Sequence, residues 1–325
     1  MNRITLKPFN VKNLASLMLL FALTCEKNLN TPEQEDINMT TRIVSLDSVN
    51  VREYDINKLE YPHLPYSRWE LTRFDDYPQD DDGIILFEWQ GRRFYNPTQM
   101  SQKLMQFLES YRRVKEEKYI VQAKKFAEKL LELSVSQDGA LFFPFSFDWY
   151  LKEKVLILSP PWYSGMAQGQ ALSAFIRLYH FSGDERYLDK ANQIRTSLTQ
   201  LKGLYDPWVV CTDNEKYYWI EEYPEDDPNH VLNGFIFALW GLYDHYRITE
   251  DSTSLHLLRA GITTVADHIE SWRNPGSVSK YTFKYHTTSK TYHMVHIKEL
   301  ERLAKVTGNA FFQNMADIFR QDYCE

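Results

Sequence analysis

The side chains best suited to acid–base chemistry lie close together near the C-terminal end of the chain. Phenols, imidazoles and an ammonium group occur together at Tyr281, Lys284, Tyr285, His286, Tyr292, His293 and His296. A tyrosine has a pKa of about 10, so it acts as a base only where a nearby cation stabilises the phenolate. Lys284 and the histidines are the candidates for that cation. The stretch therefore indicates proton transfer carried by phenols.

A pair of adjacent carboxylates is the second candidate. Glu221 and Glu222 follow the aromatic run 217–219 and precede Tyr223. Adjacent side chains in an extended segment point to opposite faces, so one carboxylate can be catalytic while the other is structural or exposed. From composition alone, an exposed acidic turn is the more frequent explanation of such a pair.

Other chemistries are excluded or only weakly supported. The chain lacks a G-x-G-x-x-G sequence, a Walker loop, an H-E-x-x-H sequence and a G-x-S-x-G sequence, so we expect no nucleotide cofactor. His293 and His296 lie one helical turn apart, with Glu299 a further turn on, but no third ligand cluster supports a metal site. We interpret the two imidazoles as polar groups that face the mouth of a barrel. The net charge of −7 provides no global cationic field for nucleic acid.

Helical hairpins are expected to position these groups. From residue 97 onward the apolar residues recur with a helical period. The expected helix pairs are 99–113 with 117–133, 165–181 with 184–201, 231–246 with 251–272, and 293–306 with 309–319. Four such hairpins predict a mainly α fold, an (α/α) barrel in the form of an incomplete toroid. A helical repeat scaffold that binds protein partners would show the same pattern.

Long links between the hairpins are expected to build the active face. Residues 136–164, 202–229 and 273–292 are rich in Tyr, Trp, Pro and charged residues. Connections of this length without structure of their own usually carry function. Aromatic residues make up 15% of the chain, which favours a sugar-binding cleft.

A small β region is expected before the helices. Strand-like runs occur at 43–46, 49–51 and 83–89, separated by turn residues. We therefore expect a β region over 42–95 and an (α/α)-barrel domain over 96–325. The acidic run 75–83 lacks the spacing of a calcium loop and is interpreted as an exposed turn.

The N-terminal residues resemble an export signal. A basic segment precedes the apolar run 14–23, and Cys25 follows in a loose bacterial lipobox. We expect 1–24 to be a signal peptide, Cys25 to carry lipid, and 25–41 to be a flexible tether, so that the protein is exported and anchored to a bacterial membrane. An uncleaved anchor and a plain secretory signal are the alternatives. Whether Cys211 and Cys324 pair is left open.

Several motifs occur in a fixed order along the helical part. They are PWYSGMAQGQ at 161–170, EEYP at 221–224, VLNGF at 231–235, GLYD at 241–244, and YH with HI at 292–297. Together they resemble the C-terminal catalytic domain of the D-glucuronyl C5-epimerases, which convert D-glucuronate to L-iduronate within heparan-type polymers. The resemblance extends from about residue 95 to 319, and NPTQ at 96–99 is a weaker match.

The resemblance implies roles for individual residues. Tyr281 and Tyr292 correspond to two catalytic tyrosines, and Glu222 and Tyr223 lie beside the substrate as further catalytic candidates. Substrate-binding roles are implied for Trp162, Tyr163, Gln168, Gln170, Asn233, Lys284, His293 and His296. Lys284 stands where the family has an Arg, so it keeps the charge but cannot form a bidentate fork to a uronate carboxylate. The short loop between the tyrosines and the reduced β region are further departures.

The expected chemistry agrees with these residues. Epimerisation at C5 of a uronate removes a proton α to a carboxylate, which is very weakly acidic until the carboxylate charge is offset. Two tyrosines, or a tyrosine opposed to Glu222, are suitable acid and base pairs. We therefore expect an exported isomerase that acts on a glucuronate-containing polysaccharide without a cofactor, with a homodimer as a candidate assembly.

Three other functions share some of these features. A polysaccharide lyase would begin with the same proton abstraction and then lose the C4 substituent. An (α/α)-barrel glycoside hydrolase would require a second carboxylate across the cleft, and Glu222 has no evident partner in the sequence. A surface lipoprotein that binds glycan without turnover would explain the reduced β region and the Lys at 284.

Overall fold

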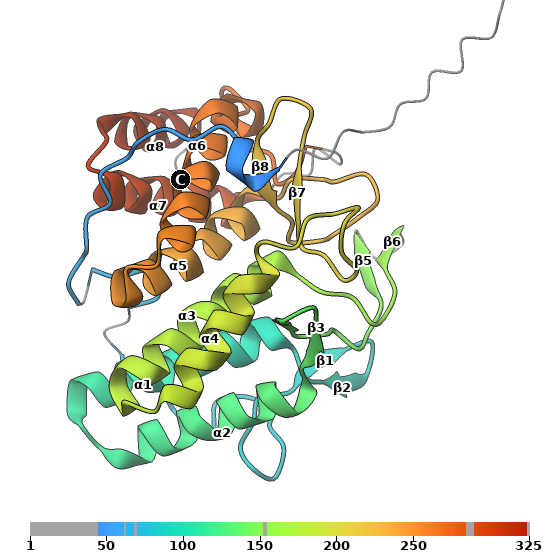
Figure 1. The fold of residues 1–325 in the computed structure, drawn as a ribbon, viewed down its shortest axis with the longest axis vertical. Helices are drawn as coiled ribbons and strands as arrows, with labels where there is room; N and C mark the ends of the chain where they lie inside the picture. The colour runs from blue at the N-terminus through green and yellow to red at the C-terminus, as the bar shows by residue number, and fades with distance from the viewer. Residues whose placement is uncertain (1–44, 62, 68–69, 152–154, 284–288, 324–325) are drawn as a thin grey trace, which may run out of the picture. The chain divides into compact units, whose positions relative to one another are not determined.

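The computed structural model describes residues 45–323, apart from 62, 68–69, 152–154 and 284–288. In this part of the chain eight α-helices form four consecutive hairpins (Figure 1). The pairs are α1 (Pro97–Val114) with α2 (Glu117–Leu133), α3 (Gly165–Ser182) with α4 (Glu185–Ser197), α5 (Leu232–Thr249) with α6 (Ser252–Trp272), and α7 (Lys290–Thr307) with α8 (Ala310–Asp322). The four predicted hairpins are thereby confirmed.

The odd-numbered helices form the inner layer. Helix α3 packs against α1 and α5, and α5 packs against α7, whereas α4, α6 and α8 each pack mainly on the inner helix of their own hairpin. The result is an incomplete (α/α) toroid, as expected from the sequence.

Caps set the helix boundaries. Asn96 accepts a hydrogen bond from the backbone N–H of Gln99 at the start of α1, and Ser164 accepts one from Ala167 at the start of α3. Gly183 ends α3 in the left-handed conformation, at φ +68°, which glycine adopts without strain. Polar caps of this kind satisfy first-turn N–H groups that have no partner within the helix.

Helices α3 and α5 approach each other closely enough for their backbones to touch. A Cβ at Gly169 would overlap the backbone of Ala238, and one at Gly241 would overlap the backbone of Gly169. Close backbone approach therefore requires glycine at both positions. Arg177 of α3 and Asp244 of α5 add a buried ion pair, with Nη2 and Oδ2 2.7 Å apart.

The segment before α1 differs from the predicted β region. Residues 46–48 form a 3-10 turn and 49–51 form no strand, so the strand prediction at 49–51 is wrong. The strand predicted at 43–46 lies partly outside the described residues. Its backbone groups bond to later parts of the chain instead: Asn50 N–H donates to Lys216 O in the link between α4 and α5, and Asn57 N–H donates to Val306 O in α7. The strand predicted at 83–89 is realised only in part, as β1 (Phe87–Trp89) paired with β2 (Arg92–Phe94).

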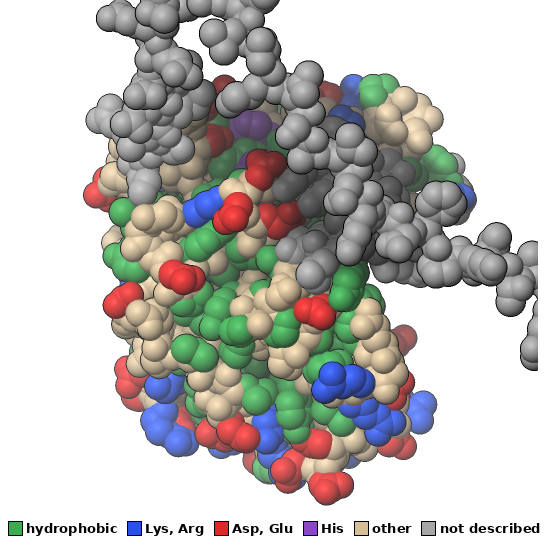
Figure 2. All heavy atoms as spheres, turned by 90° about the vertical axis from the view of Figure 1, so that its right-hand side faces the viewer, with side chains coloured by type: hydrophobic (Ala, Val, Ile, Leu, Met, Phe, Trp, Pro, Cys, Tyr) green, Lys and Arg blue, Asp and Glu red, His purple; other side chains and the backbone are tan. Residues whose placement is uncertain are grey.

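Short β-hairpins fill the first two long links. The first link holds β3 (Val135–Gln137) with β4 (Ala140–Phe142) and β5 (Trp149–Leu151) with β6 (Val155–Leu158), and the second holds β7 (Val210–Thr212) with β8 (Tyr218–Ile220). Figure 2 shows the face that carries β1, β2, β5 and β6, where hydrophobic side chains occupy the middle and Lys and Arg gather towards the lower end. Among the described helices, none is both long enough and apolar enough to span a bilayer.

Candidate active site

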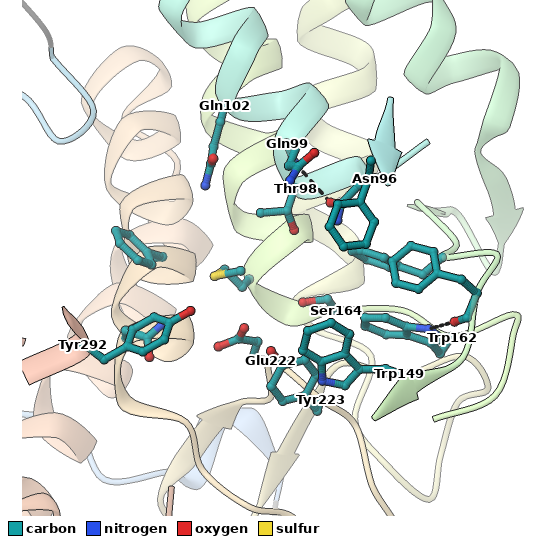
Figure 3. Close-up of a pocket in the computed structure, with 16 residues that line it drawn as sticks. Asn96, Thr98, Gln99, Gln102, Trp149, Trp162, Ser164, Glu222, Tyr223 and Tyr292 are labelled. Atoms are coloured by element: carbon teal, nitrogen blue, oxygen red, sulfur yellow. Dashed lines mark hydrogen bonds between the residues drawn. The ribbon is translucent and has the colours of Figure 1, made fainter. Parts of the chain in front are cut away.

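A cavity of about 380 Å³ lies at the N-terminal ends of the four inner helices. The first turns of these helices contribute to its wall (Figure 3), with Asn96, Thr98 and Gln99 at α1, Ser164 and Met166 at α3, Asn233 in α5, and Tyr292 in α7. The N-terminus of a helix carries a partial positive charge and unpaired N–H groups. Four such ends around one cavity favour an anionic ligand.

Aromatic side chains form one wall of the cavity. Trp162 stacks on Phe145 with ring centroids 4.0 Å apart, and its Nε1–H donates to Phe147 O at 2.7 Å. Trp149 stacks on Tyr223 with centroids 5.5 Å apart. Rings fixed in this way give the cavity a rigid and largely apolar wall, as is common in sugar-binding clefts.

Glu222 is the carboxylate of this cavity. Its side chain is only 4% exposed, and the Tyr281 hydroxyl donates to it at 3.4 Å from each carboxylate oxygen. The hydroxyls of Tyr281 and Tyr223 are also 3.4 Å apart, and the Tyr292 ring lies 4.6 Å from that of Tyr281. The four residues predicted to be catalytic are therefore in one cluster. Figure 3 shows Glu222 between Tyr292 and Tyr223.

Burial shapes the acid–base properties of the cluster. Desolvation raises the pKa of Glu222 to about 7, against hydrogen bonds from Tyr223 and Tyr281 that lower it. Desolvation, followed by the charge of Glu222, raises the pKa of Tyr281 and Tyr223 well above the usual range, and the same causes raise the pKa of Tyr292. At neutral pH the tyrosines are proton donors, while Glu222 exists in both protonation states. This makes Glu222 the better base of the cluster.

The neighbouring carboxylate faces away from the cavity. Glu221 is fully buried, its Oε1 lies 2.6 Å from His230 Nδ1, and its Oε2 accepts the His230 backbone N–H. Its backbone carbonyl also accepts the N–H of Gly165, the first residue of α3, at 2.7 Å. The opposite orientation of the two carboxylates is as predicted, but the interpretation as a surface acidic turn is wrong, because residues distant in sequence cover both side chains.

His293 and His296 support the segment that carries Tyr281. The Ser279 backbone N–H donates to His293 Nδ1 at 2.9 Å, and Ser279 Oγ lies 2.8 Å from His296 Nδ1. Both imidazoles are buried and neither lines the cavity, contrary to the expectation that they face a barrel mouth. Burial lowers the pKa of His296 to about 3, so it is neutral and does not stabilise a phenolate. No cluster of three metal-ligating side chains occurs in the described part of the chain.

The other predicted binding residues divide into two groups. Trp162 and Asn233 line the cavity, whereas the glutamines at 168 and 170 are buried in α3 away from its wall. Gln168 ties α3 to its surroundings by accepting the Phe143 N–H and donating to Leu141 O. Tyr163 packs edge-on against Phe142 instead of lining the cavity. Lys284 and Cys25 lie outside the described residues.

Sequence reasoning missed part of the wall. The start of α1 contributes Thr98, Gln99 and Gln102, and the hairpin β1–β2 contributes Phe87. The signal for α1 was present in the NPTQ segment at 96–99. Gln102 had no signal of its own, because its place on the wall depends on how α1 packs against the other inner helices.

Comparison with known proteins agrees with this arrangement. The family model described as "D-glucuronyl C5-epimerase C-terminus" matches residues 137–321. A D-glucuronyl C5-epimerase of Caenorhabditis elegans is 27% identical over an alignment of 186 residues, and the match covers 51% of this chain and 30% of that protein. An uncharacterized protein of Methanocaldococcus jannaschii is 28% identical over 158 residues, which are 48% of this chain and 50% of that protein.

Solved structures agree on the fold. The crystal structure of a sugar epimerase from a ruminal bacterium superposes with a TM-score of 0.52 at 13% identity, and the match covers 77% of this chain and 66% of that one. At this identity the likeness concerns the fold alone. The present chain spans half or less of the two sequence relatives named above. Since the family model covers more than half of the chain, the protein belongs to the D-glucuronyl C5-epimerase C-terminus family.

Proposed function

We propose that this protein is a carbohydrate C5-epimerase that converts D-glucuronate residues of a polysaccharide to L-iduronate residues. The observation that carries the proposal is the buried carboxylate of Glu222, held by Tyr281 beside Tyr223 and Tyr292. A base with a pKa near 7 and neighbouring phenols that stay protonated are the groups that a two-sided proton exchange requires.

The reaction begins at C5. Glu222 takes the C5 proton, the C5–H bond breaks, and its electron pair moves into the adjacent carboxylate of the sugar. The helix N-termini around the cavity stabilise the additional negative charge that develops there.

Reprotonation from the other face completes the inversion. A tyrosine hydroxyl, for which Tyr292 is our assignment, donates its proton to C5 and forms the new C5–H bond. The phenolate then regains a proton from water, and Glu222 releases its proton to solvent. The reaction consumes no cofactor, because the substrate and product are isomers.

A polymeric substrate is supported by the aromatic wall. Trp162, Trp149 and Phe147 line one side of the cavity, in addition to the cluster around Glu222. A wall of several aromatic side chains is typical of clefts that bind sugars. The family resemblance provides the glucuronate specificity of the proposal.

The direct test is proton NMR of a heparosan-type oligosaccharide incubated with the protein in deuterium oxide. We expect the C5 proton signal to disappear without chain cleavage. Glu222→Gln and Tyr292→Phe should each lower the exchange rate at least about 100-fold, as expected for loss of a general acid or base. Unaltered exchange in both variants would contradict the assignment. Appearance of an unsaturated uronate, seen by its ultraviolet absorbance, would instead identify a lyase.

We further propose that the protein acts outside the cytoplasm, attached to a bacterial membrane through Cys25. The support is the basic segment, the apolar run 14–23 and the cysteine that follows it. Expression in a bacterial host with a labelled fatty acid should label the wild type and not a Cys25→Ser variant. Equal labelling of both would exclude this cysteine as the lipid site.

A further inference from the structure

A second cavity adjoins the candidate active site. It measures about 200 Å³ and shares Gln102 with the first cavity; its wall consists of Tyr66, Ser67, Gln102, Met105, Gln106 and Arg302. Both cavities are bounded by the same two helices, since α1 contributes Gln102 to each and α7 contributes Tyr292 to the first and Arg302 to the second. The two cavities thus follow one another along the same pair of helices, and we refer to them together as the groove.

Helix α1 presents polar side chains along this groove. Thr98 and Gln99 lie at its start, Gln102 lies one turn on, and Gln106 lies a further turn on. Figure 3 shows Gln102 beyond Gln99 along the helix. At 1.5 Å per residue the stripe extends over about 12 Å, which exceeds a single pyranose ring. An inner helix of a packed barrel would be apolar at such positions, so amides here are suited to hydrogen bonds with sugar hydroxyls.

Arg302 stands at the far end of the groove. Its Nη1 pairs with Glu299 Oε1, and Glu299 is itself buried and accepts a hydrogen bond from Trp240 Nε1. The side chain of Arg302 remains 35% exposed. A guanidinium has five N–H donors in a planar fork, so one carboxylate partner fixes its orientation and leaves donors for a second anion. Ser67 Oγ, on the same wall, has no hydrogen-bond partner among the described residues.

We infer that the groove binds a second sugar residue of the same glycan and that Arg302 binds an anionic substituent, a carboxylate or a sulfate, on that part of the chain. The inference rests on the proposed function and deepens it. Arg302 is thereby a residue that determines substrate length and charge, not a catalytic residue. Thr98, Gln99, Gln102 and Gln106 of α1 contact the sugar rings between the reacting uronate and this anion.

Binding can be measured without turnover. In the Glu222→Gln background, isothermal titration with glucuronate-containing oligosaccharides of two, four and six sugars should give affinities that rise with length. Arg302→Gln should lower the affinity for the hexasaccharide about 10-fold, the value of one charge-assisted hydrogen bond, and leave the disaccharide unaffected. Arg320→Gln is the matched control, because Arg320 lies on α8 and pairs with Asp317 and Glu301.

A second variant is needed because Arg302→Gln leaves Glu299 without its cation and could disturb the fold. Gln106→Glu keeps the ion pair of Arg302 with Glu299 and places a carboxylate in the second cavity. It should therefore weaken binding of long acidic chains and not of the disaccharide. If the affinity of both variants rises with oligosaccharide length as in the wild type, the proposed role of the groove is wrong. If the wild type exchanges no C5 proton while Arg302→Gln still weakens binding of long chains, the proposed reaction fails and the groove stands. If the wild type exchanges the C5 proton on long chains and neither groove variant changes binding, the proposed reaction stands and the groove fails.

Discussion

Glu221 and Glu222 are consecutive residues whose carboxylates lie on opposite sides of the chain and have different surroundings. Glu221 pairs with the imidazole and the backbone N–H of His230, and its own carbonyl accepts the N–H of Gly165. Glu222 faces the cavity and is held by the Tyr281 hydroxyl. One carboxylate fixes the segment in place, so the other is presented to substrate from a rigid support.

Glu222→Gln should stabilise the protein at alkaline pH while it abolishes exchange. The pKa of Glu222 is raised from 4.5 to about 7, so proton binding favours the folded state fully below pH 4.5, and this contribution is lost as the pH rises through 7. The loss amounts to about 3 kcal/mol in the wild type. Urea unfolding at pH 5 and pH 8 should show that, from the lower to the higher pH, the variant gains about 3 kcal/mol in free energy of unfolding relative to the wild type. An equal pH dependence in both proteins would contradict the raised pKa.

Tyr281→Phe should shift the pH dependence of the residual exchange. The Tyr281 hydrogen bond lowers the pKa of Glu222, so its loss should raise that pKa further. The acidic limb of kcat/KM then moves to higher pH by about half a unit to one unit, the value of one hydrogen bond. Tyr205→Phe is the control, because Tyr205 is exposed and lies outside the cavity wall. If the acidic limb of kcat/KM does not move, it reports the titration of a group other than Glu222.

Two glycine substitutions should separate function from folding. A Cβ at Gly234 would overlap the carboxylate of Glu222, whereas a Cβ at Gly169 would overlap the backbone of Ala238. Gly234→Ala should therefore lower kcat about 10-fold or more, because Glu222 Cβ would lie 2.6 Å from the added Cβ and the carboxylate must leave its place. Gly169→Ala should cost several kcal/mol, because overpacking here forces two helices apart. Thermal melts and exchange rates on both variants check these expectations. Exchange at the wild-type rate in a folded Gly234→Ala protein would refute the first, and an unchanged melting temperature of Gly169→Ala would refute the second.

Mild acid should destabilise the fold through buried histidines. Burial lowers the pKa of His296 to about 3 and that of His245 to about 4. Each contributes stability above pH 6.5, and the contribution is lost as the pH falls from 6.5 through the lowered pKa. His245→Gln should be less stable than the wild type at pH 7 and lose less on going to pH 4. Unfolding midpoints at pH 4, 5, 6 and 7 provide the measurement, and parallel curves for both proteins would speak against a neutral buried His245.

The helices could be predicted from the sequence because their signals are local. Periodicity places the second helix of the first hairpin at Glu117–Leu133, as found, and Gly183 marks the end of α3. The helix predicted over 184–201 is shorter, at Glu185–Ser197, because the chain leaves the helix for a turn at Leu198. The strand predicted at 49–51 fails for a tertiary reason, since Asn50 bonds to Lys216 instead of to a neighbouring strand.

The candidate site could be predicted only in part. The residue types of Glu222, Tyr281 and Tyr292 indicated acid–base chemistry. The burial of Glu222, however, depends on its contacts with Gly234 and Tyr281, which lie in other segments of the chain. The same limit explains why His293 was expected at the cavity. Its partner is the backbone of Ser279, and no local pattern reveals that contact.

The glycine contact between α3 and α5 fixes the two central helices against each other. Gly169 and Gly241 hold the two helix backbones in direct contact, and the buried pair of Arg177 with Asp244 joins them again further along. Such a joint has no room to slide or to splay. A change of cavity width for a polymer therefore cannot occur between these two helices. Glu222, tied to the start of α3 through its neighbour, is a fixed point against which the bound sugar is placed.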